Sequence, residues 1–365
     1  MAVKQPDSVL PSARDEILRT SGEGPTEQLL HCTGVESTTH DVKTFTFEPV
    51  GPAGPRPLRH APGQYLTFTF EIGGAEFHRC YTIASPPTRP HTASITVKRV
   101  PGGTVSNWLH DHLTPGTALR SRGPLGEFSM HSHPADKYLF LSAGSGITPA
   151  MSMTRTLYDL ADPADVIFVN SARSPEDIIF RRELERITAT SKNIRVTQIC
   201  EAEAPAEHWN GHRGRLTLDV LRQIAPDFRD REVFTCGPPP YMDAVRRMLT
   251  DAGFPMEHHH QETFEAPPPT DTPPAADTPT FAVELTRSRL TIECDAATPL
   301  LEAASRSGIT LPSSCGQGMC GSCMATLVKG AVEMQHNGGI SPRDRAQNKI
   351  LLCCSTPLED LAVDA

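Results

Sequence analysis

The sequence lacks the features that mark several large classes of protein. Its net charge is −9, and it contains no run of lysine and arginine. Nucleic acids and anionic membranes attract basic segments, so we expect neither as a partner. No apolar stretch approaches the roughly 18 residues that a transmembrane helix needs, and residues 1–28 carry charges with no apolar core of a signal peptide. We therefore expect a cytoplasmic protein.

Motifs for oxygen chemistry are also missing. The chain has no Rieske C-x-H…C-x2-H pair, no C-x-x-C-H haem motif and no recognisable arrangement of two histidines with one carboxylate. Two histidines with one carboxylate hold the non-haem iron that activates oxygen, and the other two motifs mark a Rieske cluster and a covalently attached haem. Any such chemistry is therefore expected on a different protein.

Length and composition predict several domains. A chain of 365 residues exceeds one ordinary core, and "APPPTDTPPAADTPT" at 266–280 cannot bury enough apolar surface to fold. We expect it to be an extended, semi-stiff tether. The predicted division is an N-terminal extension 1–28, a domain 29–135, a domain 136–265, the linker 266–280 and a domain 281–365.

The two larger domains differ in their hydrophobic patterns. Residues 29–135 contain short alternating or β-branched runs such as "DVKTFTFEPV" and "QYLTFTFEI", which predict an antiparallel β-barrel or sandwich. From residue 136, continuous apolar strands such as "KYLFLSAG" and "DVIFVNSA" each precede a helix-like stretch, as in an α/β domain with a parallel sheet.

Five of the ten cysteines crowd into the last fifty-odd residues. In a reducing cytoplasm such a cluster more often binds metal than forms disulfides, and "SSCGQGMCGSC" followed by a distant cysteine has the C-x4-C-x2-C…C spacing of a plant-type 2Fe–2S cluster. Glycines 316, 318 and 321 would supply the tight turns. A zinc site is the alternative, but it lacks a second C-x2-C pair. The five cysteines 32, 80, 200, 236 and 294 are expected to be packing residues.

Residues 281–365 resemble the plant-type ferredoxins, through "LLEAASRSGITLPSSCGQGMCGSC" and "LLCCSTP". The resemblance implies a β-grasp fold, one-electron transfer and cluster ligation by Cys315, Cys320, Cys323 and Cys353. Cys354 is the neighbouring candidate. If the segment is extended, however, its side chain should point away from that of Cys353.

Two motifs in the first domain suggest a flavin. "RCYTIAS" at 79–85 places Arg79, Tyr81 and Thr82 on a predicted strand, where we expect alternation to direct the ring and the hydroxyl to one face. "PGGTVSNWLHD" offers a glycine turn and then Ser106 as a predicted helix N-cap, whose amides would bind a pyrophosphate. Each motif alone is also typical of an ordinary strand or turn.

Two motifs in the second domain suggest a nucleotide. In "LFLSAGSGITPAMSM", Gly144 and Gly146 lie between a strand and a helix and would permit close approach of a cofactor, although this is not a G-x-G-x-x-G fingerprint. "FTCGPPPYMDAVRRML" places Cys236 and Gly237 at the carboxyl end of a strand. The alternative interpretation is a helix entry with prolines in its first turn.

R-x-Y-T, G-x-G-I-T-P and C-G-P occur here in the order of the ferredoxin-reductase superfamily, which residues 29–365 resemble. Together with the ferredoxin domain, the order is similar to the electron-transfer components of Rieske-type oxygenases. The resemblance implies catalytic roles for Thr148, Cys236 and Phe264. The residues that it implies for the flavin are Arg79, Tyr81, Thr82, Lys98, Gly103, Thr104, Val105, Ser106, Glu262 and Phe264. Those implied for the nicotinamide nucleotide are Gly144, Gly146, Thr148, Pro149, Arg173, Cys236, Gly237 and Pro238.

Two segments near residue 260 have competing interpretations. "ETFE" at 262–265 is either part of the flavin site or an ordinary terminal strand. The run His258, His259 and His260 could suggest metal, but with no other ligands in view we predict solvated side chains.

The resemblance implies a reductase that passes electrons from NAD(P)H through a flavin and a 2Fe–2S cluster to a separate terminal oxygenase. A flavin fits because hydride carries two electrons and the cluster accepts one. FAD is preferred over FMN, and NADH over NADPH, although Arg173 in "NSARS" could accept a 2′-phosphate. A quaternary-amine demethylating oxygenase is preferred to an aromatic-ring dioxygenase or a hybrid-cluster protein as acceptor. A redox sensor without turnover is the alternative of a different class. The sequence leaves the oligomeric state open, with a monomer as one candidate, and the tether would allow the ferredoxin domain to swing outward to its acceptor.

Overall fold

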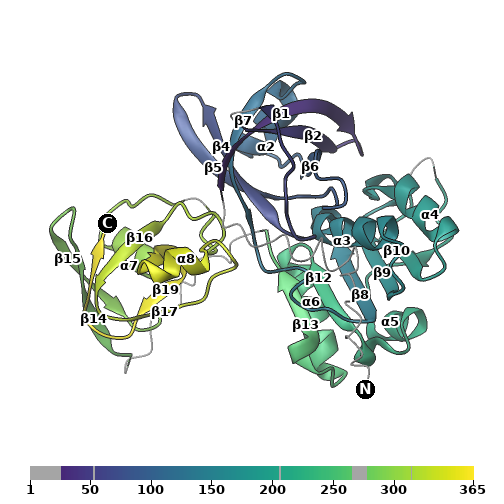
Figure 1. The fold of residues 1–365 in the computed structure, drawn as a ribbon. Coiled ribbons are helices and arrows are strands. Elements are labelled where there is room, and N and C mark those ends of the chain that lie inside the picture. The colour runs from purple at the N-terminus through teal and green to yellow at the C-terminus, as the bar shows by residue number, and fades with distance from the viewer. Residues whose placement is uncertain (1–25, 52–53, 205–206, 265–277, 314) are drawn as a thin grey trace, which may run out of the picture.

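The computed structural model describes residues 26–51, 54–204, 207–264, 278–313 and 315–365. Most of the predicted extension and nearly all of the predicted linker lie outside these residues. Over the described part of the chain, three units follow one another in sequence (Figure 1). No helix of this part is long and apolar enough to cross a membrane.

The first unit is an antiparallel sheet of seven strands. The strand order is β3-β2-β1-β7-β4-β5, with β6 paired to β2. Alternation along β2 buries Phe45 and Phe47, and alternation along β4 buries Phe68 and Phe70 against them. The elements are β1 (Thr26–Ser37), β2 (Val42–Gly51), β3 (Gly54–Pro55), β4 (Tyr65–Ile72), β5 (Ala75–Thr82), β6 (Ala93–Lys98), α2 (Thr104–His112) and β7 (Ala118–Leu125). The predicted antiparallel barrel class is confirmed.

The second unit is a parallel sheet of six strands in the order β11-β10-β9-β8-β12-β13. Its strands are β8 (Lys137–Ala143), β9 (Asp165–Ala172), β10 (Ile194–Cys200), β11 (His212–Arg213), β12 (Glu232–Cys236) and β13 (His259–Glu262). Its helices are α3 (Ile147–Asp159), α4 (Arg181–Thr190), α5 (Leu218–Ile224) and α6 (Pro239–Asp251).

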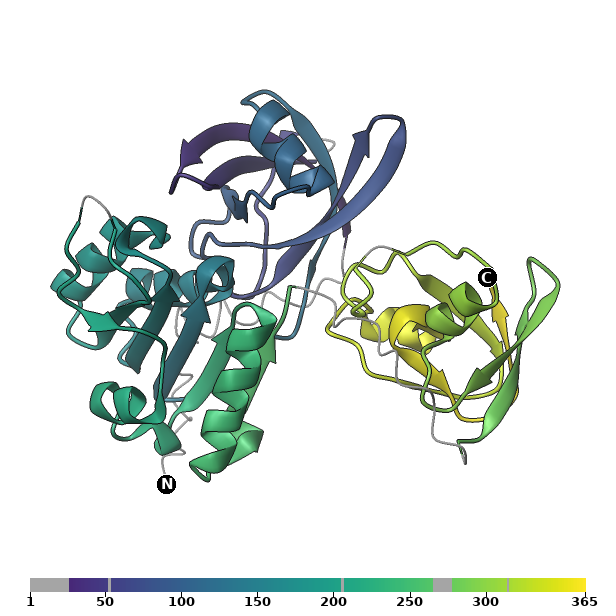
Figure 2. The same ribbon diagram turned by 180° about the vertical axis from the view of Figure 1, so that it is seen from behind.

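Helices cover both faces of this sheet (Figure 2). Because the central strands are buried on both sides, they read as unbroken apolar runs. Met151 and Leu157 of α3 pack on one face, whereas Val245 and Leu249 of α6 pack on the other. The strand order reverses between β8 and β12. Ligands bind at the carboxyl ends of strands beside such a reversal.

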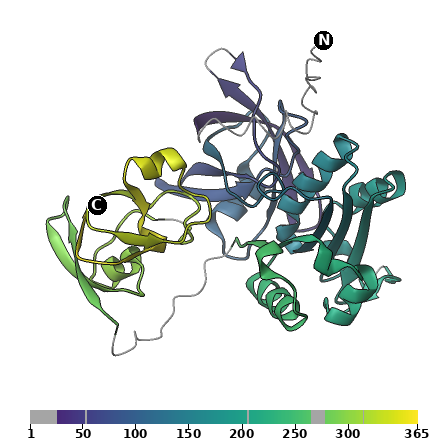
Figure 3. The same cartoon turned by 60° about the horizontal axis from the view of Figure 1, so that its bottom comes forward.

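The third unit contains a mixed sheet of five strands, β15-β14-β20-β16-β18, and a separate pair, β17-β19. Its core includes two of the clustered cysteines, Cys323 and Cys353. The strands are β14 (Thr280–Leu285), β15 (Leu290–Asp295), β16 (Met324–Lys329), β17 (Val332–Met334), β18 (Lys349–Leu351), β19 (Ser355–Pro357) and β20 (Leu361–Asp364), and the helices are α7 (Leu300–Arg306) and α8 (Pro342–Ala346). This unit lies beside the barrel, as Figure 3 shows from another direction.

Candidate functional site

The clustered cysteines lie in a loop whose backbone amides point at sulfur. The Cys315 sulfur accepts hydrogen bonds from the amides of Gln317, Met319 and Cys320 at 3.3–3.4 Å. The Cys353 sulfur accepts one from the Gly318 amide at 3.1 Å. Such donors stabilise the negative charge of thiolates bound to metal. The backbone of glycines 316, 318 and 321 has φ of 68°, 67° and 76°, a region that side chains disfavour.

The four predicted ligands converge. The Cys353 side chain interacts with those of Cys315 and Cys323, and the Cys320 side chain interacts with that of Cys315. Cysteine sulfurs brought together under amide donors are what a 2Fe–2S cluster requires. The loop therefore fits the cluster that the spacing predicts.

Cys354 does not lie in an extended segment, so the condition under which its side chain would point away from that of Cys353 is not met. Residues Leu352–Cys354 form a 3-10 turn rather than an extended segment, so adjacent side chains need not point in opposite directions. The Cys354 sulfur also approaches Cys353, but it donates to the Leu351 carbonyl oxygen at 3.6 Å. The amide bond from Gly318 goes to Cys353, which favours Cys353 as the fourth ligand.

The R-x-Y-T segment forms the end of strand β5, as predicted. The prediction that the ring and the hydroxyl lie on one face of the strand is wrong. Neighbouring residues of an extended strand face opposite sides, so the Tyr81 ring and the Thr82 hydroxyl do not share a face. Tyr81 lies edge-on to Phe68 and Phe70, with ring centroids 6.0 and 6.5 Å apart. Arg79 shares the Tyr81 side of the strand and is exposed.

Two buried polar atoms at this place have no hydrogen-bond partner within the described part of the chain. They are the Thr82 hydroxyl oxygen and one carboxyl oxygen of Glu262. Burial raises the pKa of Glu262 to about 8. This carboxyl interacts electrostatically with Tyr65, Cys80 and Cys236, so it lies where the barrel meets the carboxyl end of β12. An unpaired buried polar group costs about 1–3 kcal/mol, so both atoms fit a polar cofactor held here.

The glycine turn before α2 differs in one respect from the prediction. Gly103, not Ser106, is the N-cap of the helix. The Ser106 hydroxyl lies within the first turn and accepts a hydrogen bond from the Val100 amide at 3.2 Å. Thr104 and Val105 open the helix, and amides at such a position bind phosphate. The turn remains a candidate for the flavin phosphates.

The second glycine motif opens α3 at the strand-order reversal. Gly144 has φ of 55°, whereas a Cβ added to Gly146 would lie 2.3 Å from the Cys236 carbonyl oxygen. Gly146 therefore permits close packing of the α3 start on the end of β12, rather than close approach of a cofactor. Thr148 and Pro149 are buried in the first turn of α3, where the Thr148 hydroxyl donates to the Ser145 carbonyl oxygen at 3.2 Å.

The C-G-P segment joins β12 to α6. It lies at the carboxyl end of a strand, and it also forms a helix entry with prolines in the first turn. Cys236 ends β12 and is 2% exposed, while Pro238 is the N-cap of α6 and further prolines occupy its first turn. A cavity of about 270 Å³ opens beside this point. Its lining includes Lys98, Gly144, Arg173, Pro238 and Tyr241.

Lys98 and Arg173, the two basic residues of this cavity that the sequence analysis predicted to bind cofactors, share an acidic partner that the sequence did not reveal. Asp41 lies 3.3 Å from the Lys98 ammonium and 3.4 Å from the Arg173 guanidinium, and Asp177 also pairs with Arg173. Burial raises the pKa of Asp41, but Lys98 and the Thr39 hydroxyl outweigh this and hold it below its usual value. Arg173 thus already has carboxylate partners.

Phe264 is 41% exposed, two residues beyond the buried Glu262. The histidine run is solvated only in part: His258 is exposed, whereas His259 and His260 are half-buried. The prediction of a solvated run is therefore wrong for two of its three members. Glu232 contacts this run, with its carboxylate 2.5 Å from His258 and 2.6 Å from His260.

The cluster loop packs directly on the barrel, through residues that the motifs did not indicate. Tyr65 is 1% exposed, and its hydroxyl donates to the Met319 carbonyl oxygen at 2.7 Å and lies 3.3 Å from that of Asn337. Cys80 and Cys315 pack around Tyr65 and Met319. No local signal identifies this contact, because its two sides are 254 positions apart.

Two further contacts complete this closed face. The backbones of Gly126 and Gly338 meet so closely that a Cβ on Gly338 would lie 2.6 Å from the Gly126 Cα. Arg122 of β7 pairs with Asp344 of α8 at 3.3 Å. We call this set of contacts the barrel–cluster contact.

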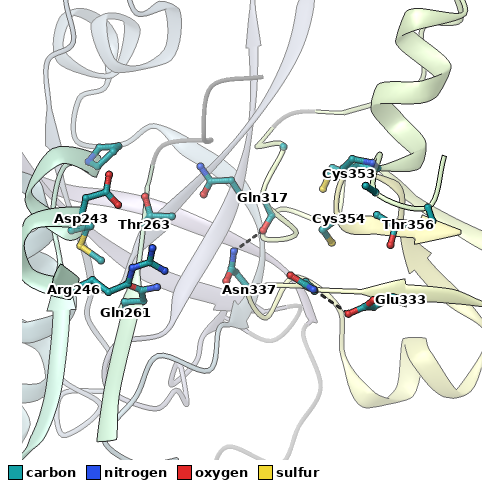
Figure 4. A pocket seen from close by; sticks show the side chains of 17 residues that line it. Asp243, Arg246, Gln261, Thr263, Gln317, Glu333, Asn337, Cys353, Cys354 and Thr356 are labelled. Carbon is teal, nitrogen blue, oxygen red and sulfur yellow. Dashed lines mark hydrogen bonds between the residues drawn. The ribbon is translucent and has the colours of Figure 1, made fainter. Parts of the chain in front are cut away.

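On its other side the cluster loop faces an open crevice of about 700 Å³ (Figure 4). Asp243, Arg246 and Gln261 of the second unit lie across from Glu333 and Cys353 of the third. The cluster loop is thus closed on the barrel side and open on the α6 side.

Comparisons with known proteins match all three units. Residues 30–130 match an oxidoreductase FAD-binding domain, residues 140–247 an oxidoreductase NAD-binding domain, and residues 283–358 a 2Fe–2S iron–sulfur cluster binding domain.

Relatives of known role resemble the chain over most of its length. A glycine betaine monooxygenase reductase subunit of Pseudomonas aeruginosa is 43% identical over 92% of this chain and 94% of its own. A stachydrine N-demethylase reductase subunit of Rhizobium meliloti is 40% identical over 92% of this chain and 96% of its own.

Among solved structures, phthalate dioxygenase reductase has a similar fold. The match has a TM-score of 0.54 and 23% identity, and it covers 97% of this chain and 100% of that one. An intact type IV self-sufficient cytochrome P450 monooxygenase matches with a TM-score of 0.66 and 24% identity, over 93% of this chain and 41% of that one.

Proposed function

We propose, from the premise that this chain belongs to the family of flavin- and iron–sulfur-containing reductase components of multicomponent oxygenases, that it takes electrons from NADH and serves an oxygenase that demethylates a quaternary amine. Electron transfer to an oxygenase follows from the family. The amine is the finer step, and it rests on one observation: the glycine betaine and stachydrine relatives are 43% and 40% identical over 92% of the chain.

The cofactors have identifiable places. The Gly103 turn and Lys98 would hold the FAD phosphates, while Thr82 and Glu262 would offer hydrogen bonds to its ring. Bound flavin exchanges two electrons with a nicotinamide and single electrons with a 2Fe–2S cluster. Cys315, Cys320, Cys323 and Cys353 would hold that cluster.

The chain's own residues set the conditions for transfer. Thr148 and Cys236 flank the strand-order reversal, where they would limit how deep a nicotinamide can enter. Cys80 and Cys315 pack against the buried Tyr65 and Met319 at the barrel–cluster contact, where they would help to keep water from the space between the flavin strand and the cluster loop. Exclusion of water limits loss of electrons to side reactions.

Asp41 and Asp177 support the choice of NADH. Both carboxylates neighbour Arg173, so the guanidinium is already neutralised and a 2′-phosphate would meet negative charge. We therefore propose that kcat/KM is higher for NADH than for NADPH. An Asp41→Asn variant should narrow the difference in kcat/KM between NADH and NADPH, because it removes one negative charge beside Lys98 and Arg173.

The test combines the purified chain with the oxygenase component of a glycine betaine monooxygenase. NADH consumption and formaldehyde release should both depend on glycine betaine and on the chain. If NADH reduces cytochrome c but glycine betaine supports no formaldehyde release, the acceptor proposal is wrong while the reductase function stands. Mass spectrometry of the flavin released by heat tests for FAD.

A further inference from the structure

The half-buried end of the histidine run meets two other side chains that can bind metal. His260 is on β13 and Glu232 opens β12, the strand beside it. His133 lies in the connection between β7 and β8. One ligand atom from each of these three residues lies within 4.8 Å of the other two. This is the pair of imidazoles with one carboxylate that the sequence did not reveal.

The three side chains are held in close contact. The His260 Nε2 atom lies 2.6 Å from a Glu232 carboxylate oxygen, and the second oxygen of that carboxylate lies 2.5 Å from the His258 Nδ1 atom. The His133 and His260 rings are stacked, with centroids 3.5 Å apart. The side chains of His260 and Glu232 are only 13% and 16% exposed. Partial burial strengthens the attraction between a cation and this carboxylate.

We propose that His133, Glu232 and His260 form a binding site for a divalent transition metal ion of the Zn²⁺ type. Two neutral imidazoles and one carboxylate are a ligand set that Zn²⁺ accepts, with a water as fourth ligand. Mg²⁺, which prefers oxygen ligands, is not expected to compete.

The movement needed to admit the ion is small. Ligand atoms about 2.1 Å from a tetrahedral Zn²⁺ are about 3.4 Å apart, so the carboxylate must retreat by less than about 1 Å from His260. The His133 ring must also leave its stacked position, because the lone pairs of parallel rings do not converge. His133 is on an inter-strand connection, where such a rotation disturbs no ladder of hydrogen bonds.

Solvent reaches the three residues through two cavities. One, of about 610 Å³, is lined by Glu232 and His258, and the other, of about 180 Å³, is lined by His133 and His260. A hydrated ion therefore has an entry path, and a water ligand has room. His336 of the third unit lines the smaller cavity as well.

None of the three ligands is among the proposed cofactor residues, although the smaller cavity is also lined by Glu262, which we place at the flavin ring. Glu232 begins β12, whereas Cys236 ends it beside the nucleotide cavity. A bound ion would cross-link the β7–β8 connection to β13, whose last residue is Glu262. The inference does not depend on the identity of the electron acceptor.

The test is isothermal titration of Zn²⁺ into the untagged full chain with its flavin and iron–sulfur cluster. We expect one site per chain, and an increase in melting temperature with Zn²⁺ because binding to the folded state stabilises it. His133→Gln and His260→Gln should each weaken binding by about tenfold or more. Iron and sulfide content, measured before and after, shows that zinc has not replaced the cluster.

His259→Gln is the matched control. It comes from the same run, but its ring contacts the Thr235 hydroxyl at 3.0 Å and is not one of the three ligands. It should leave Zn²⁺ affinity unchanged, and Mg²⁺ should give no heat. If Zn²⁺ fails to bind, or if it binds His133→Gln and His260→Gln as tightly as the parent, the proposal is overturned.

Discussion

The third unit meets the rest of the molecule through two faces that differ in kind. Towards the barrel, the Tyr65 hydroxyl, the Gly126–Gly338 backbone contact and the Arg122–Asp344 pair hold the two parts in direct contact. Towards α6, a crevice of about 700 Å³ separates them. The FAD-binding unit therefore contacts the cluster loop directly, whereas the crevice lies between that loop and α6 of the NAD-binding unit. We expect electrons to cross at the direct contact. The rate of electron transfer from flavin to cluster should therefore depend on the barrel side and be insensitive to changes on the α6 side.

Wedging the closed face apart should have the largest effect. In Gly338→Val the new side chain would collide with the Gly126 backbone, so the cluster loop must move away from the barrel. Because electron transfer slows steeply with distance, we expect cluster reduction by NADH to fall by more than about tenfold while flavin reduction is unchanged. Stopped-flow absorbance separates the two steps.

Gly74→Val is the control for backbone strain. Its φ is 80°, the same as at Gly338, but no atom lies within 4 Å of its added Cβ. If Gly74→Val slows cluster reduction as much as Gly338→Val does, backbone strain rather than separation of the domains explains the slower reduction.

Tyr65→Phe should have the next largest effect. It removes one hydroxyl and leaves the Met319 carbonyl oxygen without its donor, at a cost of about 1–3 kcal/mol. We expect cluster reduction to slow severalfold, with little change in flavin reduction. Tyr158→Phe removes a hydroxyl that contacts Thr190 on the second unit, and it should have no such effect. Equal rates in the parent and Tyr65→Phe would contradict the role of this bond.

Glu262 provides a test that depends on pH. Its pKa rises from an ordinary 4.5 to about 8 in the folded chain. Folding therefore gains from its protonation below pH 4.5, and this gain is lost as the pH rises from about 4.5 through 8. In flavin-free protein, Glu262→Gln should be more stable than the parent at pH 9, by a few kcal/mol at most, with a smaller difference at pH 6. Thermal unfolding at both pH values measures this, and an equal difference at both would refute the shift.

Arg122→Ala should have the smallest effect. The pair with Asp344 is partly exposed, at 25% and 21% of the two side chains, so its contribution is about 1 kcal/mol or less and falls with salt. Cluster reduction should slow slightly at low ionic strength and match the parent at high ionic strength. Glu333→Ala, on the crevice side, should leave the rate unchanged at both. A larger loss for Glu333→Ala than for Arg122→Ala would reverse the comparison.

Local hydrophobic patterns predicted the fold because alternation or continuity of apolar residues reflects which faces of a strand are buried. Alternation around Phe45 and Phe68 gave the antiparallel unit, and the unbroken strand from residue 138 gave the parallel one. The cysteine spacing identified the cluster loop because three of its four sulfurs lie within nine residues.

The predictions were wrong where the result depends on the exact residue at which a helix begins or on whether a short segment is a turn or a strand. Ser106 lies inside the helix that it was expected to cap, and Cys354 lies in a 3-10 turn rather than a strand. Contacts between distant segments were beyond reach altogether. Neither Tyr65 with Met319 nor His133 with His260 has a sequence pattern, because the tertiary fold alone brings them together.

Asp344 has two roles whose combination bears on how such reductases can be recombined. Its carboxylate accepts from the backbone and hydroxyl of Ser341 in the capping box of α8, and the same oxygen receives Arg122. The helix cap orients the carboxylate before the two domains touch, so docking requires little additional loss of side-chain freedom. A chimera that carries this ferredoxin module on a foreign flavoprotein should retain the anchor only when the host strand presents a basic residue at that register.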